Sequence, residues 1–173
     1  LGIGSDISDR KQAQQALQRY AAEIEDLYNH APCGYHSLDA NGIVVRINDT
    51  ELNMLGYQRE EIIGKHVTDF LTPESVVTFQ EIFPDFKQNG AVHNLELNYL
   101  RKDGTILPVS LNATALKDEE ENYLMSRSTM FDISDRKQAE AALRQSEAHY
   151  RAVVEDQTEL ICRFLPNGVL TFV

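Results

Sequence analysis

The octapeptide DISDRKQA occurs twice in the chain, at Asp6–Ala13 and at Asp132–Ala139, and its two copies organise the rest of the sequence. Eight identical residues at a single spacing indicate an internal repeat. The same spacing relates the Asn-Gly pair at 41–42 to the pair at 167–168 without a gap. We therefore expect one full module of a longer protein, with the end of one copy before it and the start of another after it.

Each octapeptide begins a predicted amphipathic helix. Asp9 and Asp135 can cap these helices, with Gln12 and Gln138 three residues later as in a capping box. Apolar residues then recur at alternating steps of four and three, which is the period of a coiled-coil seam. The predicted seam residues are Leu17, Tyr20, Ile24 and Leu27 in the first helix, and Leu143 and Tyr150 in the second. The pattern favours a homodimer, and the alternative is a helix packed on its own module.

Composition narrows the class of protein. Hydrophobic content is 42% and charged content 25%, as in soluble globular proteins. No apolar run has the length of a membrane span, and the net charge of −11 argues against a nucleic-acid partner. Cys33 and Cys162 occupy non-equivalent positions of the repeat, which argues against a disulfide framework. These features predict a cytoplasmic fragment without membrane contact, although the full protein could be anchored elsewhere.

The order of predicted elements indicates an α+β fold. Turn and cap residues delimit strands at 34–38 and 43–47, short helices at 49–55, 60–63 and 73–86, and strands at 93–101, 106–116 and 123–131. This order is typical of an antiparallel sheet with helices on one face. The predicted divisions are the end of the upstream repeat (1–8), a linker helix (9–31), the module (32–134), a second linker helix (135–156) and the start of the downstream repeat (157–173).

Several motifs resemble the PAS domain family. They are Gly42–Val44 leading to Asn48, then Leu55–Tyr57 and Glu61–Lys65, and finally Asp132–Lys137, which is similar to the "DIT-x-RK" junction between a PAS domain and its signalling helix. The resemblance implies a five-stranded antiparallel sheet that encloses a small-molecule pocket. It also implies tandem modules in a bacterial sensor protein, most often a histidine kinase.

The resemblance bears on cofactors as well. Haem-binding PAS domains usually carry an axial histidine on the long helix, and Thr72–Gln88 contains none. Flavin photoreceptors need a cysteine in the helix after the second strand, and Asn48–Leu55 has none. Neither haem nor flavin is therefore supported, and an unidentified small molecule is the remaining expectation. We assign His36, His66 and His93 surface or structural roles, and no metal-spaced cluster stands out.

Short polar residues along the late strands suggest a hydrophilic pocket. Its candidate residues are Tyr35, Asn48, Asn98, Asn112, Ser126 and Arg127. Because side chains alternate along a strand, Ser126 and Arg127 cannot line the same wall. The alternative is that apolar sets such as Leu97 and Leu111 line the core while the polar sets face water or a partner.

No catalytic motif is present, so the expected role is signalling. The resemblance predicts that Asp132, Ile133, Asp135 and Arg136 couple the last strand to the second helix, with neighbouring PAS repeats and an output kinase domain in cis. The alternatives are a receptor loaded with a cofactor or metabolite, a dimerisation spacer, and a different output such as a diguanylate cyclase.

Overall fold

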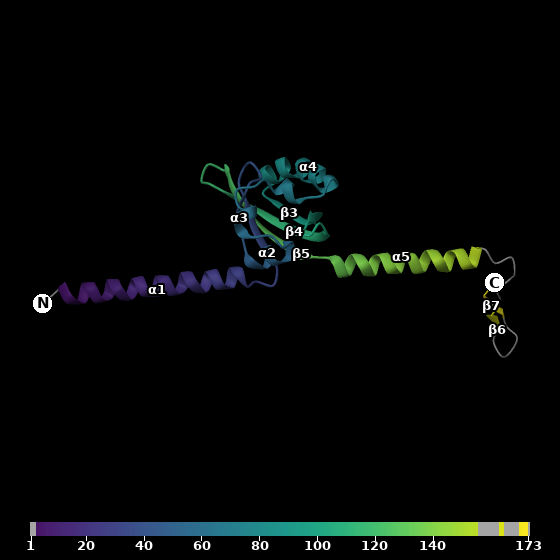
Figure 1. The fold of residues 1–173 in the computed structure, drawn as a ribbon, viewed down its shortest axis with the longest axis horizontal. Coiled ribbons are helices and arrows are strands. Elements are labelled where there is room, and N and C mark those ends of the chain that lie inside the picture. Colours follow the sequence, from purple (N-terminus) through teal and green to yellow (C-terminus); the bar gives the residue numbers. More distant parts are fainter. Residues whose placement is uncertain (1–2, 156–162, 165–169, 173) are drawn as a thin grey trace. The chain divides into compact units, whose positions relative to one another are not determined.

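The computed structural model describes residues 3–155, 163–164 and 170–172, in two compact units, Leu1–Ser134 and Asp135–Val173. The second unit contains nearly all of helix α5 (Ser134–Glu155) and a small hairpin of β6 (Arg163–Phe164) and β7 (Leu170–Phe172). The first unit contains α1 (Ile3–Asn29), β1 (Gly34–Leu38), β2 (Val44–Ile47), α2 (Asp49–Leu55), α3 (Arg59–Ile62), the 3-10 helix η1 (Val67–Phe70), α4 (Pro73–Asn89), β3 (Ala91–Leu100), β4 (Ile106–Lys117) and β5 (Tyr123–Asp132) (Figure 1).

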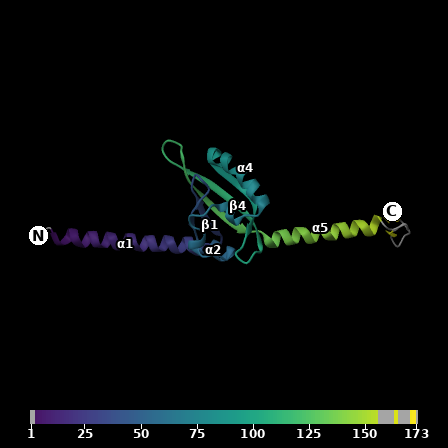
Figure 2. The same cartoon turned by 45° about the horizontal axis from the view of Figure 1, so that its top comes forward.

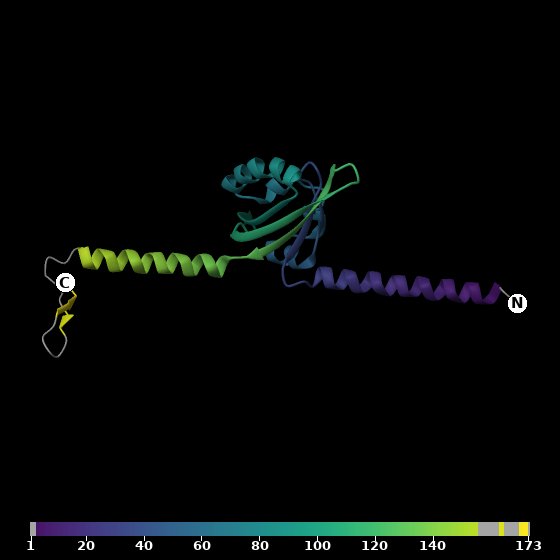
Figure 3. The same cartoon turned by 180° about the vertical axis from the view of Figure 1, so that it is seen from behind.

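The first unit is built on a five-stranded antiparallel sheet, as predicted. The strand order is β2-β1-β5-β4-β3, so the last strand in sequence lies at the centre of the sheet. There β5 pairs with β1, placing His36 opposite Ser128, and with β4 on its other side. Helix α4 lies along one face of the sheet (Figure 2), and the view from behind shows β5 leading directly into α5 (Figure 3).

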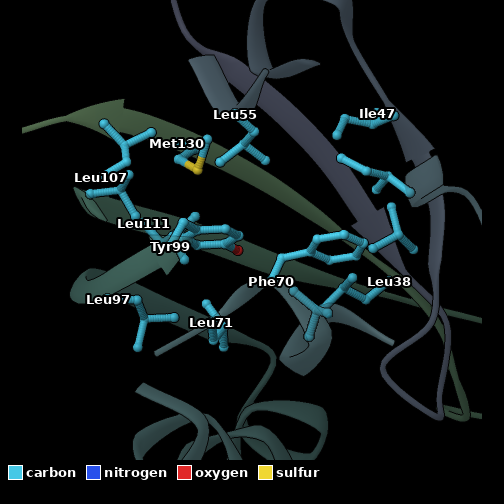
Figure 4. Packing of buried hydrophobic residues seen from close by; sticks show 14 of the residues in the cluster. Leu38, Ile47, Leu55, Phe70, Leu71, Leu97, Tyr99, Leu107, Leu111 and Met130 are labelled. Atoms are coloured by element: carbon cyan, nitrogen blue, oxygen red, sulfur yellow. The ribbon is translucent and has the colours of Figure 1, made fainter. Parts of the chain in front are cut away.

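The core fills the space between the sheet and its helices. Leu107, Val109 and Met130 are fully buried on the inner face of β4 and β5. Tyr99 and Phe70 lie in the middle of this cluster, surrounded by aliphatic side chains (Figure 4). In β3 and β4 burial follows the apolar residues, as in the alternative in which apolar sets line the core. In β5, by contrast, Ser126 and Ser128 are buried, whereas Leu124 and Phe131 are exposed.

Local signals explain why the elements begin and end where they do. Asn48 caps α2, because its side chain accepts a hydrogen bond from the Glu51 amide. Gly56 ends α2 and Gly90 ends α4, each in a left-handed conformation that costs glycine little. In the β1–β2 connection, Gly42 has positive φ and Asn41 does not, so this Asn-Gly pair does not form a type I′ turn, which needs two such residues.

The two linker helices start earlier than predicted. Helix α1 begins at Ile3, so the segment predicted to end the upstream repeat (1–8) is helical from its third residue. With no strand beside it among the described residues, this segment satisfies its backbone groups by continuing the helix. Helix α5 begins at Ser134, which places Asp135 in the first turn instead of at the cap. The predicted start of the downstream repeat (157–173) lies largely outside the described residues.

We expect neighbouring residues on opposite faces of β4 to differ sharply in their effect on stability. Leu107 is fully buried, whereas the Ile106 side chain is 55% exposed. Leu107→Ala should lower the free energy of unfolding by about 2–5 kcal/mol through lost burial and the cavity left behind. The matched control Ile106→Ala should cost less than about 1 kcal/mol. Urea denaturation followed by circular dichroism measures both, and equal losses would contradict this assignment of faces.

Candidate functional site

A small cavity of about 40 Å³ lies between α4 and the inner face of the sheet. Its walls are mostly apolar: Phe79, Ile82, Phe83 and Phe86 from α4, Leu97 and Tyr99 from β3, and Leu111 from β4. The polar lining comes from β1 and β5, where His36, Ser126 and Ser128 project inward. The cavity is therefore amphipathic, with an aromatic wall and a hydrogen-bonding end.

A buried histidine–carboxylate pair supports the polar end. His36 Nδ1 lies 2.8 Å and 3.0 Å from the two carboxylate oxygens of Glu51, and both side chains are almost completely buried. Gly34 makes room for this carboxylate, because a Cβ there would lie 3.0 Å from Glu51 Oε2. The pair joins β1 to α2. Glu51 stands three residues after the cap residue Asn48, where a glutamate can bond back to the cap backbone, but its carboxylate pairs with His36.

Hydroxyl groups extend this network across the sheet. Ser126 Oγ accepts a hydrogen bond from the Leu38 amide and lies 3.2 Å from Ser128 Oγ. Tyr123 donates to the Leu38 carbonyl, and burial raises the pKa of Tyr123 to about 12 despite an opposing hydrogen bond from Ser126. Burial, assisted by the negative charge of Glu51, raises the pKa of Tyr99 well above its ordinary value of 10. Both phenols are therefore protonated at neutral pH.

Asn48 attaches the incoming helix to this site. Its Oδ1 accepts from the amides of Tyr35 and Glu51, and its Nδ2 donates to the carbonyls of Tyr28 and Cys33. The side chain is completely buried and all four of its hydrogen-bonding positions are used. One amide thus joins the C-terminal turn of α1, the start of β1 and the first turn of α2.

The structure separates the predicted pocket residues. Ser126 lines the cavity, whereas Asn48 is buried where α1, β1 and α2 meet. The others do not line the cavity: Tyr35, Asn98, Asn112 and Arg127. Strand alternation turns these four side chains toward the opposite face of the sheet, where Asn112 accepts a hydrogen bond from the amide of Asn94 at a β-bulge. The cavity residue that sequence reasoning missed is His36, whose partner Glu51 is fifteen residues away and on another element.

Among the predicted coupling residues, Asp132 makes the most informative contacts. Its Oδ1 accepts a hydrogen bond of 2.7 Å from the amide of Ser134, the first residue of α5, and its Oδ2 lies 3.9 Å from the Arg101 guanidinium. The amide of Ile133 donates to the Pro108 carbonyl. Asp135 is exposed, and Arg136 forms an ion pair with Glu140 within α5.

Arg101 also contacts α2. Its Nε donates to the Met54 carbonyl at 2.9 Å, and the backbone amide of the next residue, Lys102, donates to the Leu55 carbonyl at 3.0 Å. The hairpin between β3 and β4 therefore contacts both the C-terminal end of α2 and the end of β5.

The predicted seam residues are exposed. In α1, Leu17, Tyr20, Ile24 and Leu27 are 64–71% exposed, so the module does not bury this apolar face. Leu143 and Tyr150 in α5 are exposed as well. In the part of the chain that the structure describes, no helix has the length and apolar character needed to cross a membrane. Within the same residues, no three His, Cys, Asp or Glu side chains form a group that could hold a metal ion.

We expect the His36–Glu51 pair to respond differently to single and double substitution. Glu51→Met should cost about 3–5 kcal/mol, because it removes the partner of a buried imidazole. The double variant His36→Leu with Glu51→Met should be more stable than Glu51→Met alone, since it leaves neither buried charge nor unpaired donor. Urea unfolding measures all three chains, and a double variant less stable than the single one would contradict the pairing.

Comparisons with known proteins agree with this architecture. The family model described as "PAS domain" matches residues 32–135. Among solved structures, the PAS domain of an HTR-like protein from Haloarcula marismortui superimposes with a TM-score of 0.63 at 22% identity, covering 71% of this chain and 99% of that one. A PAS domain from a two-component sensor histidine kinase gives a TM-score of 0.55 at 21% identity, over 66% of this chain and 97% of that one.

Curated relatives include a phosphoserine phosphatase and a sensor histidine kinase. The chain is 32% identical over 91 residues to phosphoserine phosphatase RsbP of Bacillus subtilis, covering 52% of this chain and 23% of that protein. It is 29% identical over 124 residues to sensor histidine kinase TmoS of Ectopseudomonas mendocina, covering 68% of this chain and 13% of that protein. The chain thus spans less than a quarter of either relative. The family match over residues 32–135, together with the five-stranded sheet, establishes that this chain belongs to the PAS domain family.

Proposed function

We propose that this chain is a sensory and relay module of a larger cytoplasmic signalling protein, with a two-component sensor histidine kinase as the full protein. The observation that carries the proposal is the position of Asp132. It contacts both Arg101, in the β3–β4 hairpin, and Ser134, the first residue of α5. The repeated octapeptide and the relatedness to a sensor histidine kinase support tandem modules with an output kinase in cis. In this proposal the fragment itself carries out no catalysis.

In this proposal the signal passes from the cavity to Asp132 through side chains that contact one another. A change at the cavity acts on His36 and, through the buried pair, on Glu51 in α2. The C-terminal carbonyls of α2 bond to Arg101 and Lys102, and Arg101 in turn faces Asp132. The central strand β5 offers a second route, because Ser126 and Ser128 line the cavity on the strand that ends at Asp132. The junction between β5 and α5, formed by Asp132 with Arg101 and Ser134, could adopt two arrangements. A difference of a few kcal/mol in free energy between them would suffice to bias an output domain.

The junction can be tested at the start of α5. Asp132→Ala removes the side-chain acceptor of the Ser134 amide, and the loss of a cap typically costs about 0.5–2 kcal/mol. We expect hydrogen exchange in the first turn of α5 to quicken by up to about tenfold, with unchanged protection in β4 and β5. In the full-length protein the same variant should change the activity of the output domain.

The neighbouring residue Lys102 supplies a control for this experiment. Its side chain forms an exposed ion pair with Glu61 and not with the junction, so Lys102→Gln should leave both readouts unchanged. If Asp132→Ala behaved like Lys102→Gln, the proposed junction would be wrong.

We further propose that the linker helices pair in a parallel homodimer. The support is the 3.5-residue seam together with the exposure of its large apolar side chains in α1. Exposed apolar stripes of this kind usually mark an interface, and a second copy of the same helix presents the matching stripe. Dimerisation would let two modules act on one paired output.

Charge placed on the seam should break the dimer. Leu17→Glu combined with Ile24→Glu puts two acidic side chains at the helix contact, where like charges face each other. Analytical ultracentrifugation should then find a monomer. Gln15→Glu combined with Ala22→Glu adds two acidic residues at the same seven-residue spacing on the opposite side of α1, and should leave the dimer intact. A dimer that survives both double substitutions would exclude the α1 seam as the contact.

A further inference from the structure

We propose that the cavity binds a small uncharged molecule that has a short apolar body and a single hydrogen-bonding group. This inference rests on the proposed sensory function and specifies the chemistry of its ligand. It differs from the hydrophilic ligand that the late-strand polar residues suggested, because most of those residues face away from the cavity.

The electrostatics of the lining exclude a charged ligand. Over the described part of the chain, the cavity-lining residues include no Lys, Arg, Asp or Glu. The nearest ionisable pair is already matched, since His36 faces the Glu51 carboxylate at 2.8 Å. An anion or a cation would lose its hydration here and meet no free opposite charge, which is costly in an apolar interior. An uncharged ligand avoids this cost.

The polar end supplies the hydrogen bonds that orient such a ligand. Both short contacts of the His36 ring to Glu51 use Nδ1, so Nε2 lies on the edge of the ring away from the carboxylate. Ser128 is the direct cross-strand partner of His36, and its hydroxyl lines the same cavity. An imidazole held by a carboxylate and a neighbouring hydroxyl can together serve one donor or acceptor group on a ligand.

The opposite wall selects the apolar body and limits its size. Phe79, Phe83 and Phe86 of α4 face Leu97 and Tyr99 of β3 across the cavity. A cavity of about 150 Å³ is known to bind benzene, and this one measures about 40 Å³. It therefore accommodates a ligand of only a few non-hydrogen atoms unless the α4 aromatic side chains move.

The test compares three probes of similar size and different charge: 2-propanol, acetate and ethylammonium. Each is titrated into the whole chain, and binding is followed by the amide resonances of His36, Ser128 and Leu97 in 15N-correlation spectra. We expect saturable shifts with 2-propanol in the millimolar range, as befits so small a ligand. Acetate and ethylammonium should bind at least about tenfold more weakly, because each must bury an unmatched charge.

Variants test whether 2-propanol binds at the polar end of the cavity. Ser128→Ala removes the hydroxyl inside the cavity and should weaken 2-propanol binding by up to about tenfold. Ser110→Ala makes the same change on the outer face of β4 and should have no effect. His36→Leu paired with Glu51→Met removes the imidazole without leaving an unmatched charge, and should weaken the alcohol similarly. Stronger binding of acetate or ethylammonium, equal effects of the two serine variants, or no saturable shift with 2-propanol would overturn the proposal.

This outcome is separable from the relay mechanism. Failure of all three probes together with faster exchange in α5 after Asp132→Ala would reject the ligand class and keep the relay. Selective binding of 2-propanol without any effect of Asp132→Ala would support the ligand class and reject the relay.

Discussion

The module depends on one buried amide. Asn48 forms four side-chain hydrogen bonds that hold together three segments separated in sequence, the end of α1, the start of β1 and the first turn of α2. Each of these segments ends or begins with backbone groups that no regular element satisfies, and a fully buried site offers them no water. A single side chain with two donors and two acceptors resolves this problem, which fixes the entry point of the linker helix relative to the sheet.

The His36–Glu51 pair is a different kind of constraint, since it does not follow from the requirements of the fold. Apolar residues of similar volume could fill the same space at equal or lower cost, because a buried ion pair rarely repays its desolvation. The surroundings are nevertheless shaped around it: Gly34 clears the carboxylate, and Ser128 lies across the strand from the imidazole. A costly polar pair on the wall of a cavity is better explained by a ligand or a signal than by stability.

Sequence reasoning recovered the architecture because the signals for it are local. Asn48 at the cap, the glycines that end α2 and α4, and the alternation of the strands are all visible within a few residues. It could not locate the site, because His36 and Glu51 meet only after β1 and α2 have packed. The face of each polar strand residue was also undetermined, since alternation separates Ser126 from Arg127 without showing which of them points inward.

In the proposed relay, the short helix α2 connects the cavity to the distant end of the sheet. Glu51 and Leu55 lie one turn apart, so they occupy the same side of a helix of only seven residues. The carboxylate at one position bonds to the cavity wall, and the carbonyls around the other bond to the β3–β4 hairpin. The proposed relay requires α2 to move as one body, and a helix of seven residues with a cap at each end is suited to this. In this relay a displacement of His36 would be passed to Arg101, which faces Asp132 two residues before α5 begins.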